Sequence, residues 1–153
     1  MSNRNLLIVY HTQSGTTRRL VAAAVAGARA EAGVEVRVRR AFEADSDDLL
    51  WSDGLLLATP ENFGRLSGGI KDFFDRTFYA VESLSRNWPY ALLISAGNDG
   101  RNAVTELDRI ANGYPFKLIA EPVIVRGELV SSALERSTTL GQTLAAGLAM
   151  GIF

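Results

Sequence analysis

The sequence contains no cysteine and only one histidine, His11. The lack of cysteine excludes disulfide bonds, thiolate catalysis and cysteine-ligated zinc or iron–sulfur centres. One imidazole is also too few for the usual histidine ligand sets, so we expect no transition-metal site. A Ser–His–Asp triad is not favoured, because the sequence has no nucleophile-elbow pattern.

The chain also lacks an excess of charge of either sign. Its 16 basic and 17 acidic residues leave a net charge of −1. A nucleic-acid partner is not expected, because binding to a phosphate backbone requires a basic surface. No apolar run is long enough to cross a bilayer, and the run 6–10 is too short for the core of a signal peptide. We therefore expect a cytoplasmic protein without a membrane partner.

What the chain does contain is a regular alternation of short apolar runs with longer stretches at helical spacing. This alternation is typical of βαβ units around a parallel sheet. No internal repeat or linker is visible, so residues 1–153 are expected to form a single domain. Strands are predicted over 6–10, 34–39, 54–58, 90–95 and 123–126, and helices over 16–32, 45–51, 67–81, 102–113 and 131–148.

Two features indicate the order of the strands. Residues 34–39 alternate valine with charged residues, which is typical of a strand with one wet face at the edge of a sheet. Pro122 interrupts the apolar stretch 116–126, and the fifth strand is placed after it because a central strand does not tolerate proline. We predict a three-layer α/β/α fold with a doubly wound, five-stranded parallel sheet of order 2-1-3-4-5.

In such a sheet, ligands bind beyond the carboxyl ends of the strands. The first loop there is 12–17, which is rich in hydroxyl groups and opens into a helix. Free N–H groups at a helix N-terminus can hold a phosphate without a formal charge. The loop is neither a Walker A loop nor a Gly-x-Gly-x-x-Gly loop. Its alternative interpretation is a Ser/Thr-rich helix cap.

The other two loops at this end are 59–69 and 96–101. In the first, Gly64 could allow the backbone to approach a flat ligand, and Phe63 could lie against its ring. The alternative is a turn and helix start, with Ser67 as the N-cap. In the second, Asn98 and Asp99 could bind the edge of a heterocycle, or the segment could be a turn that Asp99 caps.

Together these loops resemble the flavodoxin-like family of FMN proteins, including its branch of small NAD(P)H-dependent FMN and quinone reductases. The letters TQSGTT are similar to the family's phosphate loop, and TPENFGRLSGGIKDFFDRT is similar to its flavin-ring loop and following helix. The turn AGNDG matches the third flavin loop in position. The resemblance covers nearly the whole chain and implies a flavodoxin-like fold.

The resemblance also implies which residues bind FMN. The phosphate would be held by Thr12, Gln13, Ser14, Gly15, Thr16 and Thr17; the isoalloxazine would be flanked by Pro60, Glu61, Asn62, Phe63 and Gly64; and its pyrimidine edge would meet Gly97, Asn98 and Asp99. The flavin would carry the redox chemistry, so the resemblance implies no catalytic side chain and no metal. His11, beside the first loop, could contact the ligand or pack against a neighbour.

Two departures from the family pattern bear on function. Thr16 stands where many relatives carry Asn, and the third loop has no aromatic residue. One face of the flavin would therefore be open to a substrate or covered by a second subunit, which leaves a homodimer open.

The expected function is an FMN-binding oxidoreductase that uses NADH or NADPH to reduce a small-molecule substrate such as a flavin or a quinone. The alternatives are a flavodoxin-type electron carrier and a flavodoxin-like module without flavin. Electron carriers resemble one another in being strongly acidic, and the near-neutral charge of this chain favours the enzyme. The sequence does not specify the acceptor or choose between NADH and NADPH.

Overall fold

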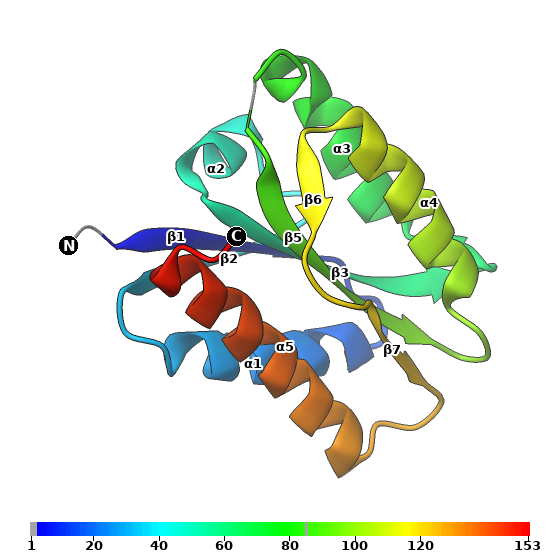
Figure 1. Cartoon of the computed structure of the whole chain (residues 1–153). Coiled ribbons are helices and arrows are strands. Elements are labelled where there is room, and N and C mark those ends of the chain that lie inside the picture. The colour runs from blue at the N-terminus through cyan, green and yellow to red at the C-terminus, as the bar shows by residue number, and fades with distance from the viewer. Residues whose placement is uncertain (1–2, 85) are drawn as a thin grey trace.

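The computed structural model describes residues 3–84 and 86–153. One twisted sheet lies between two layers of helices (Figure 1). Helices α1 (Thr16–Arg29) and α5 (Ser131–Met150) cover one face of the sheet. Helices α2 (Ser46–Trp51), α3 (Gly68–Val81) and α4 (Arg101–Gly113) cover the other. The predicted three-layer α/β/α arrangement is confirmed.

The order of the strands also confirms the prediction. The sheet runs β2-β1-β3-β5-β6, all parallel, with β7 also beside β5. A short strand, β4, pairs with β3 in the antiparallel sense. The strands are β1 (Arg4–Tyr10), β2 (Val34–Arg40), β3 (Gly54–Asn62), β4 (Arg65–Leu66), β5 (Trp88–Ala96), β6 (Phe116–Leu118) and β7 (Val123–Arg126).

The fifth position of the sheet is occupied by two segments rather than one. β6 pairs with the first half of β5, up to Tyr90↔Leu118, and β7 pairs with the second half from Leu93↔Val123. The chain between them, which ends at Pro122, leaves the ladder because proline has no N–H to donate. The segment before this proline, β6, was not predicted.

Alternation along β1 explains why an uninterrupted apolar run is needed there. Leu6 and Ile8 are buried against α1 and α5, whereas Leu7 and Val9 are buried in the cluster beneath α2, α3 and α4. A strand buried on both faces needs apolar side chains at successive positions. β2 lies at the edge, as predicted, and its side chains are only half-buried or exposed.

Two glycines allow α1 and α5 to meet backbone to backbone. A Cβ atom at Gly27 would lie 2.0 Å from the carbonyl oxygen of Thr138, and one at Gly141 would lie 2.0 Å from that of Ala24. No side chain can be accommodated at such distances without a shift of the helices. This close contact fixes the position of α1, whose N-terminus opens toward the predicted phosphate loop.

The helix boundaries follow the local signals closely, with one exception. The side chain of Ser67 caps α3 by accepting a hydrogen bond from the Ile70 N–H at 3.3 Å, which is the alternative that the sequence left open for this segment. Helix α1 ends at Arg29, a few residues before the predicted end at 32.

None of the helices described for residues 3–84 and 86–153 combines the length and the hydropathy that a membrane span requires.

Candidate functional site

The three predicted loops begin at the same edge of the sheet. β1, β3 and β5 run parallel, with Tyr10 beside Ala58 and Pro60 beside Ser95. The segments that follow these strands therefore leave the sheet side by side, at the edge from which α1, α3 and α4 start (Figure 1). The structure brings together what lies far apart in the sequence.

The first loop ends at a helix start without a side-chain cap among the residues that the structure describes. Gly15 is the N-cap of α1, with a φ of 100°, and it has no side chain to accept a hydrogen bond from the first turn. The Thr12 hydroxyl accepts a hydrogen bond from the Gly15 N–H at 3.2 Å, and the Ser14 and Thr16 hydroxyls lie 3.4 Å apart. Free amides and several hydroxyls thus surround the N-terminus of α1, the part of a helix that attracts anions.

Thr17 differs from its neighbours in this loop. Its hydroxyl lies 2.8 Å from the Ser95 hydroxyl, and the Thr17 side chain is buried. That hydroxyl therefore points into the protein, and only the backbone N–H of Thr17 is available to a ligand. The sequence did not reveal Ser95, because nothing local links it to a residue so distant along the chain.

The second loop is a β-hairpin rather than an open loop. Glu61 pairs with Leu66 and Asn62 with Arg65, so that Phe63 and Gly64 form the turn. Both turn residues have positive φ, 53° and 74°, as a type I′ turn requires. Phe63 is fully exposed and adopts a conformation that a bulky residue rarely takes.

Glu61 connects this hairpin to the third loop. Its carboxylate accepts hydrogen bonds from the Gly100 N–H at 3.0 Å and from the Ala103 N–H at 3.4 Å. Gly100 is the N-cap of α4 and has no side chain of its own to cap the helix. The carboxylate predicted to lie beside the flavin ring is therefore engaged with the start of α4.

Helix α4 reaches back to the hairpin in two places. The Asn102 side-chain amide donates a hydrogen bond to the Gly64 carbonyl. The Glu106 carboxylate accepts hydrogen bonds from the Leu66 N–H at 3.1 Å and from the Arg65 guanidinium at 2.8 Å. The Arg65 hydrogen bond holds the pKa of Glu106 below its ordinary value. These contacts fix the hairpin at both its tip and its base.

The third loop is exposed and held mainly by arginines. Gly97, Asn98 and Asp99 are all exposed. The Arg101 guanidinium lies 2.6 Å from the Asp99 carboxylate, and this hydrogen bond holds the pKa of Asp99 below its ordinary value. Arg126 donates to the Asp99 carbonyl at 2.7 Å. The N-cap of α4 is Gly100 and not Asp99, because the tight turn requires positive φ at that position.

His11 packs against its neighbours at the edge of the site. Its ring lies 5.5 Å from that of Phe42, edge to face, and against Gly69 of α3. Burial, followed by the charge of Arg40, lowers the pKa of His11. The buried Nδ1 atom has no hydrogen-bond partner within the described parts of the chain. The structure therefore places the imidazole of His11, whose charged form is disfavoured by burial, beside the uncharged loop 12–17.

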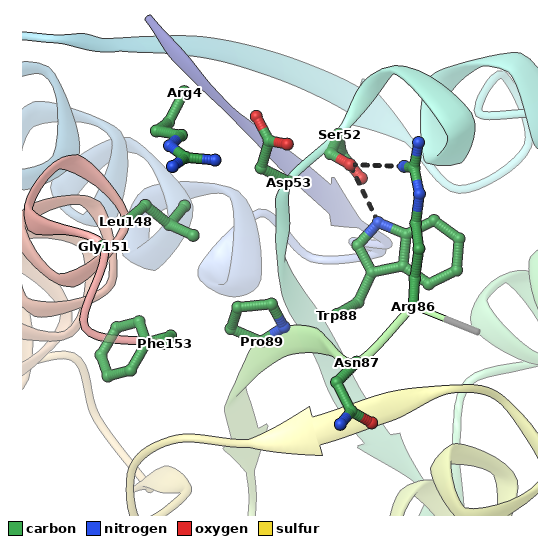
Figure 2. Close-up of a pocket in the computed structure, with 10 residues that line it drawn as sticks. All are labelled: Arg4, Ser52, Asp53, Arg86, Asn87, Trp88, Pro89, Leu148, Gly151 and Phe153. Carbon is green, nitrogen blue, oxygen red and sulfur yellow. Dashed lines mark hydrogen bonds between the residues drawn. The ribbon is translucent and has the colours of Figure 1, made fainter. Parts of the chain in front are cut away.

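A cavity of about 360 Å³ lies at the opposite end of the sheet. Figure 2 shows that part of its lining comes from the amino ends of strands: Arg4 opens β1, Trp88 opens β5, and Asp53 precedes β3. Another part comes from the end of α5 and the residues after it. Arg86 lies over the Trp88 ring, and Phe153 lines the same cavity. Because ligands of such sheets bind at the carboxyl ends, this cavity is not part of the candidate site.

The comparison with known families agrees with this geometry. Residues 36–127 match the family described as NADPH-dependent FMN reductase, and this match covers more than half of the 153 residues. The chain belongs to the NADPH-dependent FMN reductase family. The matched segment contains the second and third loops, whereas the first loop, 12–17, lies before it. The resemblance inferred from the loops is confirmed.

Two curated relatives match part of the chain. A flavodoxin of Aquifex aeolicus is 40% identical over 70 residues, which cover 46% of this chain and 38% of that protein. An NAD(P)H dehydrogenase (quinone) of Acidithiobacillus ferrooxidans is 33% identical over 92 residues, which cover 47% of this chain and 46% of that protein. The matches therefore span less than half of the length of either relative.

Solved structures agree in fold at low sequence identity. An archaeal flavodoxin superposes with a TM-score of 0.83 at 17% identity, covering 94% of this chain and 98% of the other. A WrbA-like flavodoxin from Agrobacterium tumefaciens gives 0.76 at 18% identity, covering 97% and 99%. Such similarity establishes the flavodoxin-like fold alone, and the function of a site has to be argued from its residues.

Proposed function

We propose that this protein binds FMN and acts as an NAD(P)H-dependent oxidoreductase that reduces a flavin, a quinone or a similar small acceptor. The observation that carries the proposal is the uncapped, hydroxyl-lined N-terminus of α1, which lies beside two exposed loops in a member of this family. Each of these features alone has a structural explanation. A flat ligand that carries a phosphate requires all of them together, and all of them lie at the same edge of the sheet.

The donors of the first loop fit the phosphate of FMN. Hydroxyls of Thr12, Ser14 and Thr16 and the first amides of α1 can donate to phosphate oxygens, and Gly15 adopts the left-handed conformation that the turn needs. Gln13 is exposed at the rim of the loop. Thr17 contributes its backbone N–H, since its hydroxyl is bonded to Ser95.

The second and third loops supply the walls for the ring. The hairpin presents Phe63 and Gly64 at its exposed tip, with Pro60 and Asn62 half-buried below it. Gly97, Asn98 and Asp99 present small and polar groups on the other side. Bound there, FMN would supply the redox chemistry that links the pyridine nucleotide to the acceptor. The residues of the chain bind and orient the ring.

A flavodoxin-type electron carrier is the second candidate. The similarity to the Aquifex aeolicus flavodoxin over 70 residues favours it. The net charge of −1 favours the enzyme, because docking to a basic partner protein depends on an acidic surface. A module without flavin is the third.

An anaerobic titration with pyridine nucleotide separates the three candidates. The purified protein is saturated with FMN, its visible spectrum is recorded, and NADH or NADPH is then added in the absence of air. If the protein is the enzyme, its bound flavin bleaches rapidly on addition of one or both nucleotides. A carrier binds FMN but is reduced only when a partner reductase is added. A module without flavin shows no change in the spectrum of added FMN.

A further inference from the structure

The start of α4 is capped by a residue from another part of the candidate site. Gly100, the N-cap of α4, has a φ of 84° and no side chain. The carboxylate of Glu61 takes the place of a capping side chain and accepts from both Gly100 and Ala103. A carboxylate at this position stabilises a helix, because the first turn carries free N–H groups and a partial positive charge.

Glu61 is at the same time a hairpin residue. It pairs with Leu66 and stands two positions before the exposed tip at Phe63. The hairpin and α4 are therefore tied in both directions, since Asn102 of α4 in turn holds the carbonyl of Gly64. Loops held by several side-chain contacts have fewer conformations available in the free protein.

We propose that Glu61 is a positioning residue that couples the hairpin at 60–64 to the start of α4, so that the two loops beside the ring keep one arrangement before the ligand binds. This inference rests on the proposed function and deepens it. The resemblance alone implied that Glu61 flanks the ring, whereas its contacts assign its carboxylate to the other loop.

Loss of this coupling weakens binding without removing any group that touches the phosphate. Without the carboxylate, the hairpin and the third loop become ordered only when the flavin binds, and that ordering reduces the affinity. For Glu61→Ala, the dissociation constant of FMN is expected to rise about tenfold, as for an interaction of moderate strength.

The test compares Glu61→Ala with a variant that weakens α4 and leaves the hairpin contact intact. Thr105→Gly serves this purpose, because Thr105 is an exposed helical residue of α4 and glycine destabilises a helix interior. FMN affinity is measured by fluorescence titration for both variants and the wild type. Amide hydrogen exchange of residues 61–66 is measured in the absence of FMN, as a readout independent of the ligand.

Coupling predicts faster exchange in the hairpin and about tenfold weaker FMN binding in Glu61→Ala, while Thr105→Gly keeps both values within about twofold of the wild type. Equal effects of the two variants, or no effect of Glu61→Ala, would overturn the inference. Should Glu61→Ala fail to fold, Glu61→Gln is used, which keeps one acceptor and is expected to give a smaller loss in the same direction. A wild type that does not bind FMN would instead overturn the proposed function, and the inference with it.

Discussion

The hydroxyls of Thr17 and Ser95 lie 2.8 Å apart in the interior and join the first turn of α1 to the end of β5. Both side chains are buried, and they come from segments that are distant in the sequence. This bond fixes the loop 12–17 relative to the third loop. Removal of either hydroxyl would leave the other one buried without a hydrogen-bond partner.

Ser95→Ala is therefore expected to lower the free energy of unfolding by about 1–3 kcal/mol, because the Thr17 hydroxyl stays buried without a partner. Urea denaturation measures the change. The double variant Thr17→Val/Ser95→Ala should lose less than the sum of the two single changes. Thr139→Val, at an exposed position, is the control. Additive losses would show that the two hydroxyls do not interact.

Adjacent glycines at the start of α3 are expected to respond differently to a methyl group. A Cβ atom at Gly69 would lie 3.0 Å from Cγ of His11, whereas one at Gly68 would meet nothing within 4 Å. Gly69→Ala should therefore be less stable than Gly68→Ala by about 1 kcal/mol, the lower end of the cost of overpacking. Thermal unfolding compares the two variants. Removal of the imidazole in His11→Ala should abolish this difference, and a difference that persists would contradict the contact.

The titration of His11 gives a stability prediction with a definite sign. Its pKa in the folded protein is lowered from 6.5, first by burial and then by Arg40. Near and below pH 6.5, the unfolded chain binds more protons than the folded one. The free energy of unfolding therefore falls as the pH decreases from about 7 to 5. His11→Gln removes this contribution. Urea unfolding of both proteins across this range should show that the free energy of unfolding falls more steeply with decreasing pH in the wild type. The same pH dependence in both proteins would contradict the lowered pKa of His11.

The hairpin tip offers a stabilising substitution. Phe63 has a φ of 53° and is fully exposed, so it gains nothing from burial in the free protein. Asparagine is favoured at the first central position of a type I′ turn. Phe63→Asn is expected to raise the free energy of unfolding by about 1 kcal/mol, the cost of the left-handed conformation for a bulky residue. If Phe63 lies against the ring, FMN binding should weaken at the same time, as measured by titration. A variant less stable than the wild type would contradict backbone strain at Phe63.

Much of the fold could be predicted from the sequence, because its signals are local. Continuous apolar runs marked the buried strands β1, β3 and β5, and Ser67 marked the start of α3. The alternation along 34–39 placed β2 at the edge. These patterns depend only on the neighbours of a residue, so the order of the sheet followed from them and the rules of connection.

The contacts that shape the candidate site could not be predicted. Phe63 at a turn position hides the hairpin signal, which is normally Asn-Gly or Asp-Gly. Glu61 could not be recognised as a cap of α4, because it stands 39 positions from Gly100. The segment β6 was missed because the fifth strand was placed only after Pro122. In the structure, residues 116–118, which precede this proline, also pair with β5. All three depend on packing between distant segments.

The central claim is that the loop 12–17 holds the phosphate of a flavin. The most direct test compares the affinities of the wild type for FMN and for riboflavin, which differ only in that phosphate. Charge-assisted hydrogen bonds from the loop should make FMN bind more tightly by on the order of a hundredfold. Gly15→Val, which cannot keep a φ of 100° without strain, should reduce this preference. Equal affinities of the wild type for FMN and riboflavin, or binding of neither, would contradict the claim.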